Sequence, residues 1–77
     1  MVQIELMGLT EKNARYKYYP EDSKEYGIVA LNRETGERTL EQSVDGYSTN
    51  YAAHALRRME EFQKLGNFPK KDIVAWY

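Results

Sequence analysis

The chain has 77 residues, a formal net charge of −1, one histidine and no cysteine. A chain of this length buries only about 60% of the surface that its unfolded form exposes, so we expect residues 1–77 to form a single domain around one core. Without cysteine the chain can form no disulfide bond and offers no thiolate ligand, and a lone histidine cannot build a zinc site without several carboxylates around it, so no cofactor or metal is expected.

The N-terminal half alternates between apolar and polar residues. Residues 2–6 do so strictly, which predicts a strand with one buried face that ends near Gly8. Residues 14–19 predict a second strand, which Pro20 closes. Residues 25–31 are apolar on both faces, and we interpret them as the central strand of a sheet.

A loop containing glycine follows this third strand. Residues 32–37 read NRETGE and place Gly36 where a hairpin loop needs a residue that tolerates a positive φ. The chain should reverse there, so residues 38–44 are predicted to be the antiparallel partner of the third strand, with Leu40 and Val44 on one face.

The second half opens with an amphipathic helix. Apolar residues recur at spacings of three and four over residues 48–65, which forms one stripe along a helix. Ser48 or Thr49 can cap the first turn, and Gly66 is placed to end the helix in the left-handed conformation. Residues 73–77 are apolar and extended again, so they either add a strand or pack along the sheet.

These elements predict an α+β fold, in which an antiparallel sheet of three or four strands packs one face against one long helix. The start of the chain lacks the continuous apolar run of a secretory signal, and no stretch approaches the ~18 to 20 apolar residues of a membrane span. We therefore expect a soluble, cytoplasmic protein with no membrane partner.

His54 is the one side chain that titrates near neutral pH without help. It lies at the edge of the helical stripe with no serine or cysteine nucleophile implied beside it, so we expect no enzymatic activity. We interpret it as a structural or solvated histidine; the alternative is an anion contact shared with Arg57 and Arg58. The acidic residues 21–25 lack the spacing of a calcium loop, and the scattered glycines form no phosphate loop.

Seven tyrosines and one tryptophan make aromatic residues the main candidates for binding. Each offers a large apolar face with a polar tip, which suits half-buried sheet positions and interfaces equally well. On a strand, Tyr16 and Tyr18 would share one face and Tyr19 would lie on the other. At the end of the chain, Trp76 and Tyr77 either plug the small core or contact a partner. We predict noncatalytic binding of a protein partner, or of a second copy, through these five residues, with the choice between core and interface left open.

Single-stranded nucleic acid is the alternative ligand, because bases stack on exposed rings and lysine and arginine side chains flank the tyrosines. The pI of about 5.8 lies well below the ~9 typical of such proteins, which disfavours this reading. Charge is also uneven: residues 21–47 carry seven acidic and three basic side chains, for a net charge of −4. An asymmetry of this kind would orient a partner.

Four segments of the chain carry a resemblance to a known group of proteins. They read YKYYPEDSKEYGIV, NRETGE, YAAHAL and GNFP, the last followed by VAWY. In their order and in the closing aromatic pair, residues 16–77 resemble a family of small uncharacterised proteins from Gram-positive bacteria. The resemblance implies a compact bacterial domain and no particular activity, and it carries over no catalytic or ligand residue.

Overall fold

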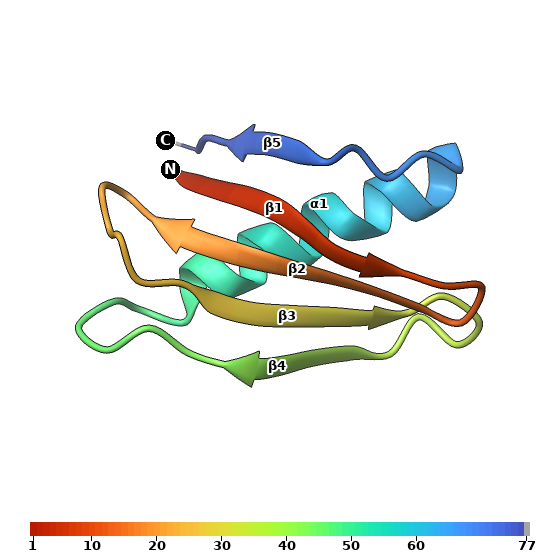
Figure 1. Cartoon of the computed structure of the whole chain (residues 1–77), viewed down its shortest axis with the longest axis horizontal. Helices are drawn as coiled ribbons and strands as arrows, with labels where there is room; N and C mark the ends of the chain where they lie inside the picture. Colours follow the sequence, from red (N-terminus) through yellow and green to blue (C-terminus); the bar gives the residue numbers. More distant parts are fainter. Residues whose placement is uncertain (77) are drawn as a thin grey trace.

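The computed structural model describes residues 1–76, and this part of the chain forms five β-strands and one α-helix (Figure 1). The α+β fold with an antiparallel sheet and one packed helix is confirmed, whereas the predicted number of three or four strands is wrong. The elements are β1 (Val2–Leu9), β2 (Asn13–Pro20), β3 (Gly27–Asn32), β4 (Arg38–Gln42), α1 (Asn50–Leu65) and β5 (Lys71–Val74).

The strand order across the sheet is β4-β3-β2-β1-β5, and every neighbouring pair is antiparallel. The extra strand is β5, in which the tail returns after the helix and pairs with β1, Val2 opposite Val74. Because this addition extends the sheet beyond β1, the central strand is β2, and the prediction that the third strand is central is wrong. The two ends of the described chain lie side by side (Figure 1).

Two strands contain an extra residue that the alternation did not predict. The partner of Leu6 in β1 is Tyr16, but Gly8 is opposite Arg15, so the register shifts and the strand continues past the glycine to Leu9. The register of β4 against β3 also shifts, between Ile28 and Val29. A bulge leaves a strand paired on both sides of the inserted residue, which is why Gly8 does not end β1.

Glycines lie in the β3–β4 turn and at the end of the helix, as predicted. Gly36 has a φ of 79°, and Gly66 caps α1 in the left-handed conformation with a φ of 71°. At its start the helix differs slightly from the prediction of residue 48, because Thr49 is the N-cap and makes no capping bond with its side chain. Instead, the Ser48 hydroxyl accepts a hydrogen bond from the N–H of Asn50, at 3.1 Å.

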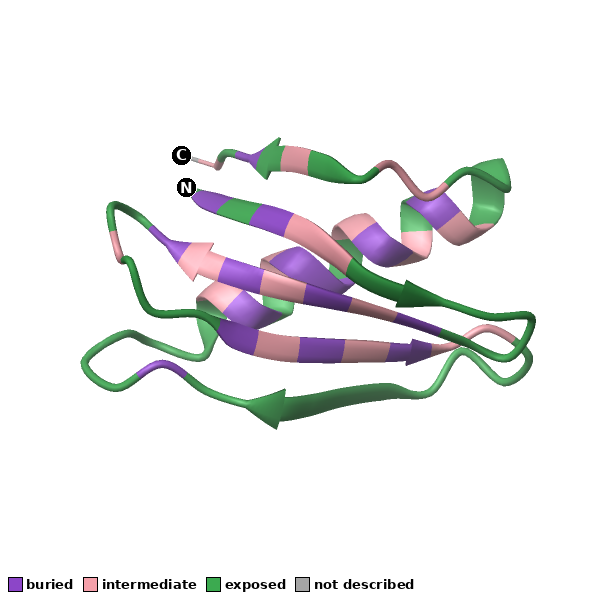
Figure 2. Ribbon diagram, viewed as in Figure 1, coloured by how far each residue is buried: buried purple, intermediate pink, exposed green. Residues whose placement is uncertain are grey.

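The core lies between α1 and one face of the sheet. Along β2 and β3 every second residue is buried, which appears as alternating bands in Figure 2. Tyr16 and Tyr18 are among these residues, with 0% and 1% of their surface exposed. The Tyr16 ring contacts Phe62 of the helix with centroids 5.8 Å apart, and its hydroxyl donates a 2.6 Å hydrogen bond to the carbonyl of Pro69. The core therefore satisfies the polar tip of its most buried tyrosine.

The helix does not cover the whole sheet. It packs against β1, β2, β3 and β5, while β4 extends beyond it (Figure 1). The opposite face of the sheet has no element packed on it within residues 1–76. In the same residues no helix has the length and apolar character needed to cross a membrane.

Candidate binding surface

Within residues 1–76 no element covers the face of the sheet opposite α1, and we call it the open face. The residues of the open face alternate with the core residues along each strand, so the pairing of the strands shows which residues belong to it. They are Gln3 and Glu5 of β1; Arg15, Lys17 and Tyr19 of β2; Ile28 and Ala30 of β3; Thr39 and Gln42 of β4; and Lys71 and Ile73 of β5.

Charges on the open face alternate in sign. Glu5 lies opposite Lys17 on one side and opposite Lys71 on the other. Arg15 donates two hydrogen bonds to the carboxylate of Glu41, at 2.8 and 3.1 Å. Opposite charges at neighbouring sheet positions stabilise the pairing by about 0.2 to 1 kcal/mol. The three cations Arg15, Lys17 and Lys71 and the two carboxylates of Glu5 and Glu41 sum to a net charge of +1. The open face is therefore suited to a partner of mixed charge.

A pair of tyrosines lies at one end of the open face. The rings of Tyr19 and Tyr26 are tilted against each other with centroids 5.7 Å apart, and the ammonium group of Lys17 sits 4.6 Å from the Tyr26 centroid. Tyr26 keeps 36% of its surface exposed, and Ile28 follows it on the same face. Aromatic rings held in this way offer a large contact area at low entropy cost.

Tyr26 was missed as a candidate site residue. The signal was present, because the alternation of residues 25–31 places Tyr26 with Ile28 on one face. What the sequence lacked was the register, which brings that face next to Tyr19 of the neighbouring strand.

Tyr16 and Tyr18 lie in the core, which is one of the two alternatives that the sequence left open for the tyrosine cluster. Tyr19 lies on the opposite face from them, as predicted, and is half-buried. Burial raises the pKa of Tyr16 to about 12, with a smaller contribution from the nearby negative charge of Asp72. Burial also raises the pKa of Tyr18, against a hydrogen bond from the Val44 backbone that lowers it. Both rings fill the space between the sheet and the helix as part of the hydrophobic core.

Trp76 folds back onto the helix. Its ring stacks on His54 with centroids 3.8 Å apart and an interplanar angle of 11°, and it meets the edge of Tyr51 at 5.4 Å. Trp76 is half-buried and packs against the core cluster, so one part of the ring is structural and the other is accessible. Tyr77 lies outside the described residues.

His54, Arg57 and Arg58 are neighbours on the outer side of α1, and together they line a surface pocket of about 210 Å³ beside Trp76. Arg58 is already engaged, since it contacts Asp72 at 2.7 Å and Glu61 at 3.2 Å. The arrangement brings the three predicted residues together, but it commits one of the two guanidinium groups to carboxylates of the chain. An anion would therefore be held mainly by Arg57 and His54.

The acidic residues 21–25 form no metal site. Glu21 instead accepts hydrogen bonds from the N-terminal ammonium group of Met1, at 2.9 Å, and from the hydroxyl of Tyr51, at 2.8 Å. These two donors lower the pKa of the Glu21 carboxyl. Nowhere in residues 1–76 do three or more histidine or acidic side chains gather in a group able to hold a metal ion.

Comparison with known proteins adds no relative: no protein-family model, no curated protein and no solved structure matches the chain. The resemblance to a Gram-positive family stays a prediction, and the function is argued from the surface alone.

Proposed function

We propose that this domain binds another protein in the cytoplasm without catalysing a reaction, and that the open face is its contact surface. One observation supports this proposal above the others. Tyr19, Tyr26 and Ile28 lie partly exposed, side by side, on a sheet face that has no covering element within residues 1–76. Tyrosines of this kind are enriched among the residues that carry binding energy in protein interfaces.

The charge pattern favours a protein over a nucleic acid. Strong binding of single strands needs free cations that follow the backbone, in addition to stacking rings. On the open face Arg15 is paired with Glu41, and Glu5 lies between Lys17 and Lys71. Weak single-strand binding is the second candidate, supported by the Tyr19 and Tyr26 rings with Lys17 beside them.

Photo-cross-linking tests the proposed function. We would place a benzophenone amino acid at Tyr26 and, as the matched control, at Tyr47, which is similarly exposed, at 36% and 38%, but lies beside the N-terminal end of α1. After irradiation in bacterial lysate treated with nuclease, we expect a discrete cross-linked protein from position 26 and none from position 47. A product of twice 9.1 kDa would identify the partner as a second copy.

Two results would contradict this function. Equal labelling from positions 26 and 47 would show that the open face has no preferred partner. Cross-links that appear only without nuclease, together with binding of a fluorescent oligonucleotide at low salt, would replace it with the nucleic-acid alternative.

A further inference from the structure

The free edge of the sheet at β4 is exposed along its whole length. All five residues of β4 are exposed, and Figure 2 shows the strand as one continuous exposed band. Leu40 lies opposite the buried Val29 and yet keeps 38% of its surface accessible, because α1 packs mainly on β1, β2 and β3 and covers β4 only at its edge, where Arg38 pairs with Glu60. The edge therefore presents both backbone and an apolar side chain to the solvent.

Hydrogen-bond alternation tells which backbone groups point outward. Asn32 donates its N–H to the carbonyl of Glu37 at 2.8 Å, so this pair is hydrogen-bonded across the β3–β4 ladder. In an antiparallel ladder every second pair is of this kind, so Thr39 faces β3 whereas Arg38 and Leu40 direct their N–H and C=O groups away from it. Four backbone groups are thus available for a further strand.

On the opposite edge of the sheet, one outward backbone group is already occupied. In β5 the outward N–H of Ile73 is already bound to the carboxylate of Asp72, at 2.8 Å. The two edges therefore differ at this position, because within residues 1–76 no side chain is hydrogen-bonded to the outward N–H groups of Arg38 and Leu40.

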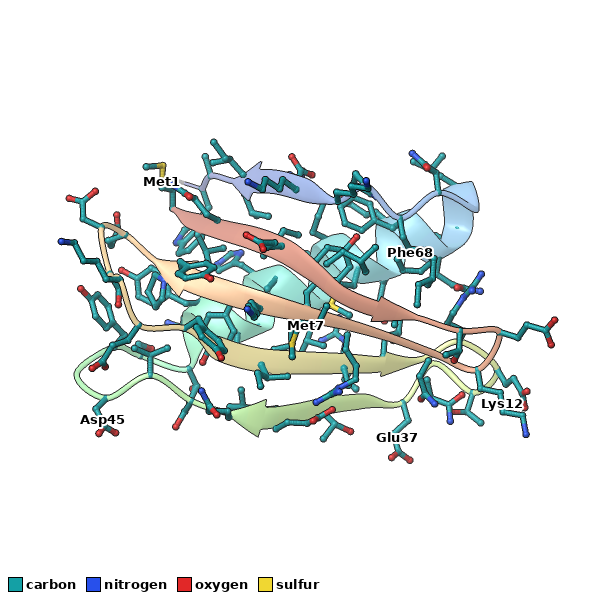
Figure 3. All side chains as sticks on the ribbon, in the orientation of Figure 1. Met1, Met7, Lys12, Glu37, Asp45 and Phe68 are labelled. Carbon is teal, nitrogen blue, oxygen red and sulfur yellow. The ribbon has the colours of Figure 1, made fainter. Side chains whose placement is uncertain are left out.

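Acidic side chains flank the β4 edge at both ends. Glu37 lies at its start and Asp45 beyond its end, as Figure 3 shows. The one arginine of the strand, Arg38, is paired with Glu60 of the helix. Near Asp45 the surface forms a pocket of about 430 Å³, whose lining includes Glu25, Asp45, the Tyr26 ring and a single cation, Lys24. A lysine or arginine from a partner would meet two carboxylates there, beside the Tyr26 ring that Lys17 contacts from the open face.

We propose that β4 binds an extended, basic segment of the partner protein as a sixth strand of the sheet. The segment would form hydrogen bonds with the outward groups of Arg38 and Leu40 and place a cationic side chain in the pocket beside Tyr26. The five residues of β4 span roughly 17 Å, which matches a segment of about five or six residues. Pairing of two β4 edges is disfavoured because it would bring the same carboxylates together. The inference rests on the proposed protein-binding function and names the segment that is bound.

The test is an NMR titration of the ¹⁵N-labelled full chain with a synthetic, end-blocked heptapeptide of alternating lysine and valine. We expect the largest shift changes at the amides of Arg38 and Leu40, and slower hydrogen exchange at both. A glutamate–valine peptide of the same length should cause none, because the flanking charge is negative. A lysine–valine peptide with N-methyl groups on alternate residues should also fail, because it cannot complete the ladder.

Variants separate the backbone contribution from the charge contribution. Leu40→Pro removes an outward N–H at an edge position, where proline is tolerated, and should abolish binding, whereas Leu40→Ala should not. Asp45→Asn should weaken binding by about three-fold, a typical effect of one exposed charge pair, and Glu11→Gln, on the β1–β2 turn, should leave it unchanged.

Three outcomes would overturn the proposal: no change at Arg38 and Leu40 at millimolar peptide, changes centred on β5 or the open face, or equal binding of the N-methylated peptide. Formation of a dimer through β4 without peptide would also overturn it. Each of these results leaves the proposed function intact if the cross-link from position 26 persists. Loss of that cross-link contradicts the proposed function itself.

Discussion

At the scale of single residues, Gly27 packs directly against the ring of Tyr18. A Cβ atom added to Gly27 would lie 2.2 Å from the Tyr18 ring and 2.5 Å from the carbonyl oxygen of Gln42. Contacts this short are not found between real atoms, so the ring, the backbone or both must move. Glycine is needed here because a buried tyrosine occupies the space of its missing side chain.

We predict that Gly27→Ala lowers the free energy of unfolding by about 1 to 3 kcal/mol, as expected for an overpacked core site. The matched control is Gly8→Ala, because a Cβ at Gly8 meets nothing within 4 Å. Urea denaturation should show a clear loss for the first variant and a change within about 0.5 kcal/mol for the second. Equal effects would mean that the sheet relaxes around the new methyl group.

Tyr16 makes the free energy of unfolding depend on pH in the alkaline range. Its pKa is raised to about 12 in the folded chain, against about 10 when unfolded. The unfolded state therefore loses this proton first, and above pH 10 it binds fewer protons than the folded state. The free energy of unfolding should fall as the pH rises from about 10 to about 12.

We predict that Tyr16→Phe weakens this alkaline loss and costs about 0.5 to 1.5 kcal/mol at pH 7, because the hydrogen bond to Pro69 is removed. Tyr47→Phe is the control, since that side chain is exposed. Urea melts at pH 7, 9 and 11 measure both effects. An unchanged pH dependence in Tyr16→Phe would show that other tyrosines dominate the titration.

The sequence predicted the environment of these residues only in part. Alternation separated Tyr19 from Tyr16 and Tyr18, and this is confirmed. It did not predict which side would be the core, because tyrosine suits both a buried and a half-exposed sheet position. The core side is set by the apolar face of α1 and by the carbonyl of Pro69, which accepts the hydrogen bond of the Tyr16 hydroxyl. Both are far from Tyr16 in the sequence.

At the scale of elements, strands and helix were predictable where the signal is local. Gly36 and Gly66 mark their turn and helix end through a conformation that favours glycine. The bulges in β1 and β4 were not predicted, because an inserted residue is defined only against the register of a partner strand. For the same reason the order of the strands, and with it the central place of β2, could not be read from alternation.

The C-terminal tail contacts both the sheet and the helix. It forms β5 and then places Trp76 against the first turns of α1, so both alternatives that the sequence left open, a strand and packing on the core, hold for the described part of the tail. The stack on His54 gives that histidine a structural role.

We predict that Trp76 and His54 are energetically coupled by about 0.5 to 1.5 kcal/mol, the usual value for stacked rings. A double-mutant cycle with Trp76→Ala and His54→Ala measures this coupling from thermal or urea unfolding. Replacing His54→Ala by Lys64→Ala, near the other end of the helix, should give additive effects. Additivity in both cycles would show that the stack is not formed in solution.

At the scale of the whole molecule, stability should be unevenly distributed across the sheet. The inner strands are covered by α1, whereas β4 extends beyond it (Figure 1). The ion pair between Arg38 and Glu60 is a tie from β4 to the helix, and Arg58 with Asp72 is the corresponding tie from β5. Elements with few buried contacts open first, so β4 should separate from the sheet without global unfolding.

The ion pair between Arg38 and Glu60 is sensitive to acid. The guanidinium group lowers the pKa of the Glu60 carboxyl through a hydrogen bond and through its charge. A carboxyl whose pKa is lower when folded stabilises the protein above its unfolded pKa of about 4.5, and this contribution is lost as the pH falls below that value. Because the pair is exposed, its total effect should stay below about 1 kcal/mol.

We predict that Arg38→Gln speeds hydrogen exchange at Thr39, whose N–H faces β3, and leaves the amides of β2 unchanged. Arg58→Gln is the reciprocal control and should speed exchange in β5 instead, since its partner there is Asp72. NMR-detected exchange near neutral pH resolves these positions separately. If either variant accelerated exchange uniformly across all strands, the sheet would open as one unit, and β4 could not exchange partners independently of the core. Exchange confined to β4 would mean that its outer edge can adjust to an added strand while β1 to β3 keep the open face in place.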